Sequence, residues 1–343
     1  MGMVIDGTWT DEDRFVERGI FVREPSVFGS EVPHDLIDAM SAEPGRFHLI
    51  ASLSCPWSHR ALIVRALKRL EAFVPVQLAH GLRVQGYAIN GSVPWTVPGT
   101  GEAIRHLHEL YTLSDPAYTG RSTVPVLWDS TSKRIVSNSS LGIMRAFDAV
   151  ATIDGHPDFT LRPEALAEEI DMLGARIYDQ LSNGVYRAGF AEQQRAYDTA
   201  VHGVFTMLDE LEMRLTGQRH LFGPAVTEVD WQLLPTLLRF DAIYHVLHKC
   251  CRRRLIDYPS LWAYGRDLYQ WNGVSGTVDF AAMRAGSYEN DTTGNPHRIV
   301  AVCPDADWTA PHNRTALGPA QITLRSGSRV EVDPATLKLL KRH

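Results

Sequence analysis

The chain has 343 residues, a length typical of roughly two domains. Its 44% hydrophobic and 22% charged residues exclude a disordered, collagen-like or coiled-coil protein. A chain of this length can bury a core without disulfide or metal staples, and its net charge of -6 argues against a general binder of nucleic acid or anionic membranes.

Targeting and redox features favour a cytoplasmic protein. No apolar run reaches the roughly 18 residues that a transmembrane helix needs, and the acidic N-terminus, Met1–Asp13, has no signal-peptide core. Four cysteines, two of them adjacent at Cys250 and Cys251, do not resemble a disulfide framework and favour a reducing compartment. We therefore expect no membrane and no nucleic acid among its partners.

The first part of the chain predicts one small α/β domain. Residues 1–45 are polar and contain Pro25, Pro33 and Pro44, which favours an irregular lead-in. Residues 46–150 follow, with a Gly- and Pro-rich insertion at about 81–119. The expected elements are strand 47–53, helix 56–71, strand 73–78, a short helix near 103–111, strands 123–128 and 134–137, and helix 138–149. This order is typical of a compact α/β unit.

The second part predicts an all-helical domain at 160–285. Strand patterns disappear, and apolar residues recur at helical spacing over 164–181, 193–214, 228–247 and 260–270. Thr227 and Asp230 have the spacing of a capping box at the start of the third of these helices. Residues 286–343 are rich in Pro, Gly and Asn and are expected to form a surface tail.

The sharpest chemical signal is the run SCPWSHR, which begins at Ser54 between the first predicted strand and helix. Cys55 is expected at the helix N-terminus, where unpaired backbone N–H groups and the helix dipole stabilise a thiolate, the nucleophilic form of cysteine. Ser58 stands where a redox Cys-x-x-Cys motif has its second cysteine, so an external thiol must resolve any disulfide at Cys55. The alternative is a buried, inert cysteine at the strand end.

A second signal is Pro125, at the start of the apolar strand 123–128. A proline is tolerated there at a sheet edge or in a special turn. In a thioredoxin-like unit it would be a cis-proline opposite the cysteine, and it would leave the backbone of Val124 able to pair with a peptide-like thiol. The proline alone is weak support, but together with the upstream SCPWSHR run it favours a thioredoxin-like unit.

Six sequence blocks resemble the xi-class glutathione transferases, also called glutathionyl-hydroquinone reductases. They are CPWSHR from Cys55, DPAYTGR from Asp115, VPVLWD from Val124, NGVYRAGFA from Asn183, RFD from Arg239 and DYP from Asp257. The resemblance runs from about Phe21 to Arg314. It implies the glutathione transferase architecture, an α/β thioredoxin-like N-terminal domain plus an all-α C-terminal domain, in a homodimeric enzyme that uses glutathione as co-substrate.

The resemblance also implies roles for individual residues in binding the thiol. Cys55 would be the catalytic nucleophile, and Val124 with the cis-proline Pro125 would bind the thiol's peptide backbone. Arg121 and Ser140 would help to hold the anionic ends of this low-molecular-weight thiol.

Two tyrosines are expected to face the phenolic substrate. Tyr186 lies in the NGVY block, and Tyr288 ends the late run Gly286-Ser287-Tyr288. Both would hydrogen-bond the substrate and act as general acids or bases. The alternative for both is packing between helices.

Two positions depart from the family pattern. The family has Glu-Ser where this chain has Ser139-Ser140, so the carboxylate expected to pair with the γ-glutamyl ammonium is absent. Tyr87 stands where the family has a Trp that packs on the bound thiol, and Trp95 is a candidate replacement. An ammonium without its partner should weaken glutathione binding by roughly one to three decades, or redirect specificity.

The favoured function is reductive removal of glutathione, or a related small thiol, from an S-conjugated hydroquinone or similar aromatic thioether through a mixed disulfide at Cys55. A second hypothesis keeps this reaction but uses a non-glutathione thiol such as mycothiol, in line with Ser139 and with a composition in which arginine far outnumbers lysine. A third hypothesis is a non-catalytic protein that only binds an aromatic ligand.

Two further clusters are better explained without a ligand. His245, His248, Cys250 and Cys251 have a spacing that fits no common zinc site, and one helix cannot direct all four at one ion, so we expect no metal. The run Arg252-Arg253-Arg254 is more typical of a solvated face or an interface patch than of an anion site.

Overall fold

The computed structural model describes residues 2–11, 16–17, 20–21, 28–151 and 156–340, so Pro25 and parts of the predicted lead-in lie outside the described residues. The chain divides into two compact units. Unit 1 comprises Met1–Phe15, Arg23–Ile153 and Asp279–Thr292, and unit 2 comprises Val16–Val22, Asp154–Val278 and Thr293–His343. A late segment of the sequence therefore belongs to the same unit as Cys55.

The main sheet of unit 1 has four strands in the order β10-β9-β5-β6. They are β5 (Phe47–Ala51), β6 (Val76–Leu78), β9 (Val126–Asp129) and β10 (Arg134–Ser137), which confirms the four predicted strands to within a few residues at each end. β6 runs parallel to β5, while β9 is antiparallel to both β5 and β10. Every residue of β9 is buried, as its apolar run predicts for a central strand.

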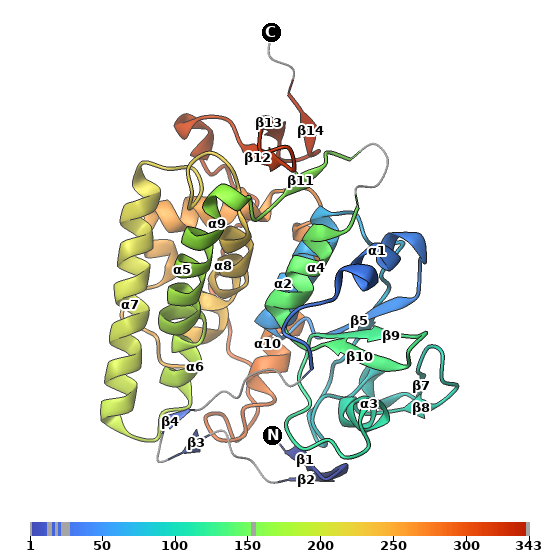
Figure 1. Ribbon diagram of the computed structural model, residues 1–343. Helices are drawn as coiled ribbons and strands as arrows, with labels where there is room; N and C mark the ends of the chain where they lie inside the picture. Colours follow the sequence, from blue (N-terminus) through green and yellow to red (C-terminus); the bar gives the residue numbers. More distant parts are fainter. Residues whose placement is uncertain (1, 12–15, 18–19, 22–27, 152–155, 341–343) are drawn as a thin grey trace. The chain divides into compact units, whose positions relative to one another are not determined.

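Three helices complete the thioredoxin-like arrangement. α2 (Pro56–Leu67) and α4 (Ser140–Ala149) pack together on one side of the sheet, and α3 (Leu107–Ser114) lies on the other (Figure 1). Lys68, just after α2, forms an ion pair of 2.9 Å with Asp148 of α4. The order β5-α2-β6-β9-β10-α4 is the one that the sequence predicts, with α3 in the insertion.

The lead-in and the insertion contain regular elements that the sequence analysis did not predict. They are β1 (Met3–Ile5), β2 (Thr8–Thr10), β3 (Val16–Glu17), β4 (Ile20–Phe21), α1 (His34–Ala42), the 3-10 turn η1 (Asn90–Ser92), β7 (Trp95–Thr96) and β8 (Ala103–Ile104). β1 is joined to the loop before the cis-proline, because Val4 and Gly120 exchange two backbone hydrogen bonds of 2.9 Å. Strands of two or three residues carry too little periodicity to be detected in a sequence.

Unit 2 is built around α8 (Glu228–Arg239), all twelve residues of which are buried. The predicted capping box begins this helix, with the backbone N–H of Thr227 donating to Asp230 Oδ2 at 2.7 Å. The other helices are α5 (Ala167–Ile177), α6 (Gly184–Gly189), α7 (Gln194–Thr216) and α9 (Pro259–Tyr269). Two predicted helices end in π-helical turns, η3 (Tyr178–Ser182) and η4 (Phe240–Tyr244), and the 3-10 turns are η2 (Glu164–Leu166), η5 (Leu255–Asp257), η6 (Ser275–Thr277) and η7 (Arg314–Leu317).

The tail is more regular than its composition suggests. α10 (Phe280–Tyr288) crosses the boundary predicted at 285 between the helical domain and the tail, and it belongs to unit 1 instead of the helical unit. In unit 2 an antiparallel sheet has the order β11-β12-β13-β14, formed by β11 (Phe159–Thr160), β12 (Gln321–Leu324), β13 (Arg329–Asp333) and β14 (Lys338–Leu339). Within the described ranges, no helix is long and apolar enough to cross a membrane.

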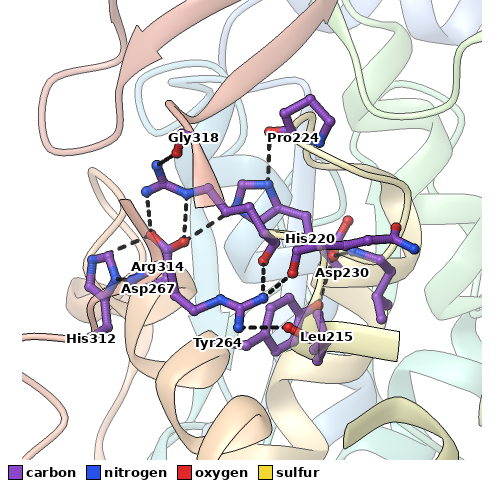
Figure 2. Close-up of polar contacts among 12 residues, drawn as sticks. Leu215, His220, Pro224, Asp230, Tyr264, Asp267, His312, Arg314 and Gly318 are labelled. Carbon is purple, nitrogen blue, oxygen red and sulfur yellow. Dashed lines mark hydrogen bonds and ion pairs between the residues drawn. The ribbon is translucent and has the colours of Figure 1, made fainter. Parts of the chain in front are cut away.

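A buried polar network fixes the tail to the helices of unit 2 (Figure 2). Arg219 donates two hydrogen bonds to the carboxylate of Asp267, at 2.8 and 2.9 Å, and a third to the carbonyl of Gly318. Arg314 donates to the carbonyls of Leu215 and Arg219. Burial alone would raise the pKa of Asp267, but His220, whose Nε2 lies 3.5 Å from the carboxylate, and the hydrogen bonds from Arg219 hold this pKa well below its usual range. The tail is therefore held by buried charged groups, and these groups can stay buried because they are paired with one another.

Candidate active site

Cys55 is the N-cap residue of α2, as the sequence predicts. Its Sγ accepts the backbone N–H of Ser58 at 3.5 Å, and Pro56 occupies the first turn. The thiol also lies 3.6 Å from the carbonyl oxygen of Val124, and the residue is only 6% exposed. The sulfur thus lies between the N-terminus of α2 and the backbone expected to bind a peptide-like thiol.

The loop opposite Cys55 contains the predicted cis peptide bond, between Val124 and Pro125. A buried phenol holds this loop: the Tyr111 hydroxyl donates to the carbonyl of Thr123 at 2.7 Å and accepts its N–H at 3.2 Å. Asn138 Nδ2 also donates to the Tyr111 hydroxyl at 3.2 Å, and burial raises the pKa of Tyr111. Tyr111 is a residue that the sequence analysis missed, because it lies in the insertion and its partners are distant in sequence.

The predicted thiol-binding residues Arg121, Ser139 and Ser140 all belong to unit 1 and are half-buried. The carbonyl of Arg121 accepts a hydrogen bond of 2.8 Å from the hydroxyl of Tyr118, which orders the backbone at this point. Ser139 is the N-cap residue of α4, with Oγ accepting the N–H of Gly142 at 3.1 Å, and Ser140 is the first residue of that helix. The hydroxyl at the family's glutamate position therefore already serves the helix.

The insertion reaches the residue next to Cys55 through Arg83. Its Nη2 donates to Ser54 Oγ at 3.1 Å, and its guanidinium carbon lies 4.2 Å from the ring centre of Tyr87, which is itself buried. Arg83 thus contacts both Tyr87 and Ser54, and packing of Tyr87 on a bound thiol stays a prediction. Trp95, the candidate replacement, lies in β7, paired with β8. No motif in the sequence singles out Arg83, so the sequence analysis missed it.

The helix α10 packs directly against the Cys55 loop. A Cβ on Gly286 would lie 2.3 Å from Ser54 Cβ, so only glycine permits this approach. Asn290 Oδ1 accepts the backbone N–H of Arg83 at 2.7 Å. Gly286 therefore approaches Ser54, and Asn290 binds Arg83. A helix turns by about 100° per residue, so Tyr288 lies roughly 200° around α10 from Gly286, on a different face. Tyr288 is buried in the same unit as Cys55, and its role towards a substrate stays a prediction.

Tyr186 lies in α6, within unit 2, and is half-buried. Its hydroxyl is 3.2 Å from the hydroxyl of Tyr244, and its ring packs against Tyr244, His248 and Phe190. Because Tyr186 and Cys55 belong to different units, their action on one substrate stays a prediction.

The two clusters set aside in the sequence analysis have ordinary environments. Burial raises the pKa of Cys250 to about 12 and lowers the pKa of His248 to about 4, while Cys251 is exposed. In the arginine run, Arg253 pairs with Asp209 at 3.2 Å, and Arg254 pairs with Asp257 at 2.9 Å.

One group of side chains has metal-compatible spacing among the described residues. Ligand atoms of His106, His108 and Glu109 lie within 4.8 Å of one another. His106 and Glu109 form the capping box of α3, in which the Glu109 carboxylate accepts the N–H of His106 at 2.7 Å. Helix capping accounts for their proximity, and we assign no ion to this group.

Family models match both parts of the chain. Residues 54–150 match the glutathione S-transferase N-terminal domain, and residues 193–264 match the C-terminal domain. The chain is 41% identical to the glutathionyl-hydroquinone reductase PcpF of Sphingobium chlorophenolicum, over 89% of this chain and 96% of that protein. It is 40% identical to the glutathionyl-hydroquinone reductase YqjG of Escherichia coli K12, over 92% of this chain and 98% of that protein.

Solved structures agree with these matches. A xi-class glutathione transferase from Natrialba magadii superposes with a TM-score of 0.79 at 36% identity, covering 92% of this chain and 97% of that one. Glutathione-bound YqjG superposes with a TM-score of 0.74 at 42% identity, covering 79% and 89%.

A thioredoxin-like unit with a cysteine at the N-terminus of α2 and a cis-proline loop opposite it, together with a helical unit, defines a glutathione transferase. Within that class, the chain belongs to the xi family of glutathionyl-hydroquinone reductases. The fold predicted from the sequence is therefore confirmed.

Proposed function

We propose that this enzyme removes glutathione reductively from glutathionyl-hydroquinones. The observation that carries the proposal is the thiol of Cys55 at the N-terminus of α2, in contact with the carbonyl of Val124. It is supported by nearly full-length similarity to PcpF and YqjG, both named glutathionyl-hydroquinone reductases. These relatives favour catalysis over simple binding of an aromatic ligand, and the glutathione-bound YqjG structure favours glutathione over mycothiol.

The reaction proceeds in two steps, each of which is the attack of a thiolate on sulfur. The Cys55 thiolate attacks the sulfur of the conjugate, and the carbon–sulfur bond breaks with its electron pair passing to the aromatic carbon. That carbon takes up a proton, which yields the free hydroquinone and a mixed disulfide between Cys55 and glutathione. A second glutathione thiolate then attacks the mixed disulfide, which releases glutathione disulfide and restores the Cys55 thiolate. In total, one glutathione thiol and the sulfur of the conjugate become one disulfide, and the aromatic carbon takes the electron pair of the broken carbon–sulfur bond together with a proton.

An aromatic carbon is a poor leaving group until the ring takes the keto form. Tyr186 and Tyr288 hydrogen-bond the phenol oxygens and move the protons that this tautomer requires. Val124 holds the peptide backbone of glutathione, Arg121 and Ser140 hold its anionic ends, and Tyr87 packs on it. A homodimer and a cytoplasmic location stay predictions.

The test compares Cys55→Ser with Cys251→Ser, in which an exposed cysteine of unit 2 is replaced. Hydroquinone release from a glutathionyl-hydroquinone is followed by chromatography with glutathione in excess. We expect Cys55→Ser to fall to the uncatalysed rate and Cys251→Ser to match the wild-type protein. Turnover retained in Cys55→Ser would exclude the mixed-disulfide route.

A further inference from the structure

We infer that Tyr244 is a positioning residue for Tyr186, and that its hydroxyl directs the Tyr186 proton towards the phenolic substrate. The inference rests on the proposed function, because it assumes that Tyr186 acts on that substrate. The two hydroxyl oxygens lie 3.2 Å apart, although the residues are 58 positions apart in sequence. Tyr186 comes from α6 and Tyr244 from the π-helical turn η4 that follows α8.

The burial of the two tyrosines separates their roles. Tyr186 is half-buried, whereas Tyr244 is only 1% exposed. The more exposed hydroxyl, that of Tyr186, is the one assigned to the substrate, and Tyr244 acts through its contact with that hydroxyl.

Aromatic packing fixes the ring of Tyr186 in place. Tyr244 and His248 meet it edge-on, with ring centres 5.6 and 5.1 Å away, and Phe190 stacks on it at 6.2 Å. Offset and edge-to-face arrangements at these distances are the favourable ones for aromatic rings. A ring held on several sides loses little further freedom when a substrate binds, so the direction of its hydroxyl is set in advance.

His248 closes this aromatic cluster without adding a charge. Burial lowers its pKa to about 4, and a backbone hydrogen bond to Val185 offsets only part of that shift, so the imidazole is neutral at pH 7. Gly189 of α6 makes room for it, since a Cβ there would lie 2.5 Å from His248 Cγ. The hydroxyl pair consequently lies beside a neutral ring that packs against both tyrosines.

A hydroxyl group has one proton to donate and lone pairs that accept. When Tyr244 donates to the oxygen of Tyr186, that contact does not use the Tyr186 proton, which the proposed mechanism passes to a phenol oxygen of the substrate. The same donor stabilises the negative charge on Tyr186 after its proton has moved. Replacing Tyr244 by Phe removes both effects and keeps the ring.

A double-mutant cycle with Tyr186→Phe, Tyr244→Phe and the double variant tests the inference. We expect Tyr244→Phe to lower kcat about tenfold and to change the KM for the conjugate less than about twofold. A loss of this size is part of the effect of general acid–base catalysis, which is about 10²–10⁴-fold. In the Tyr186→Phe background the second substitution should change kcat less than about twofold, because no hydroxyl is left to position.

Tyr264→Phe is the matched control. Tyr264 is also buried in unit 2, and its hydroxyl donates to Asp230 at 2.8 Å, outside the aromatic cluster. We expect this variant to have a lower melting temperature and wild-type kcat. If Tyr264→Phe lowered kcat as much as Tyr244→Phe, loss of a buried hydrogen bond would explain both and the inference would be overturned.

The remaining outcomes distinguish the inference from the function on which it rests. If Tyr244→Phe lowered kcat by the same factor with and without the Tyr186 hydroxyl, Tyr244 would act independently of Tyr186. That result would overturn the inference and leave the proposed function intact. A Tyr186→Phe variant with wild-type kcat would overturn both the inference and the role of Tyr186. Activity in Cys55→Ser would instead overturn the proposed reaction.

Discussion

Ser139 is the position where family resemblance and local structure make opposing demands. The resemblance predicts a glutamate there, and this chain uses the serine hydroxyl to accept the N–H of Gly142 at 3.1 Å as the N-cap of α4. We therefore predict two separable effects of Ser139→Glu. Glutathione gains a charge partner for its ammonium, and α4 loses its cap.

The magnitudes can be worked from the contacts. A charge-assisted hydrogen bond to the γ-glutamyl ammonium should lower the KM for glutathione by about tenfold or more, which corresponds to about 1.4 kcal/mol. Loss of the serine cap costs about 1 kcal/mol of stability, and a carboxylate at a helix N-terminus returns about 0.3–1 kcal/mol of it. Ser139→Asp separates the gain in glutathione binding from the loss of the helix cap, because aspartate caps a helix as well as serine does. It should keep the wild-type melting temperature and give a smaller gain, since its carboxylate is one methylene shorter.

The assay measures hydroquinone release against glutathione concentration at a saturating level of conjugate, together with thermal unfolding of each variant. The gain in Ser139→Glu should shrink as salt is added if the site is open to solvent, because the new interaction is electrostatic. An unchanged KM in both variants would refute the reasoning and place the ammonium elsewhere. Loss of activity on the natural substrate with a gain for glutathione would point to a different thiol.

Two further predictions concern packing and pH. Gly286→Ala should lower kcat/KM at least about tenfold, because the new methyl group displaces Ser54 beside Cys55. The control Gly276→Ala, with nothing within 4 Å of its Cβ, should match the wild-type protein. Wild-type kinetics in Gly286→Ala would contradict this prediction. Burial raises the pKa of Asp129, but hydrogen bonds from Arg46, Thr131 and Ser132 together outweigh this effect and lower the pKa from 3.8 to about 2. The stabilisation is therefore present above about pH 4 and lost as the pH falls through about 2. Urea midpoints measured across that range should fall less steeply in Asp129→Asn, and an equal slope in both proteins would contradict the assignment.

Features with local sequence signals were predicted correctly. Cys55 at the N-cap of α2 follows from a cysteine and a proline between an apolar strand and a helical pattern. The capping box at Thr227 and the cis peptide bond at Pro125 were likewise visible in short motifs. The cap at Ser139 was missed although serine is a preferred N-cap residue, because that position was interpreted only as a lost carboxylate.

Features that depend on distant partners could not be predicted. Arg83 and Asn290 are 207 residues apart, and nothing in either neighbourhood indicates their hydrogen bond. The pair Tyr186 and Tyr244 depends on how α6 and η4 pack, which sequence periodicity does not specify. The strands β12–β14 were missed because a segment rich in Pro, Gly and Asn favours loops.

The central claim is that Cys55 takes the thiol from the conjugate. The most direct measurement is the intact mass of the protein after a single turnover with one equivalent of a glutathionyl-hydroquinone and no free thiol, followed by peptide mapping. The account predicts one glutathione per chain, located on Cys55, together with one equivalent of free hydroquinone. Hydroquinone released while Cys55 remains unmodified would contradict it.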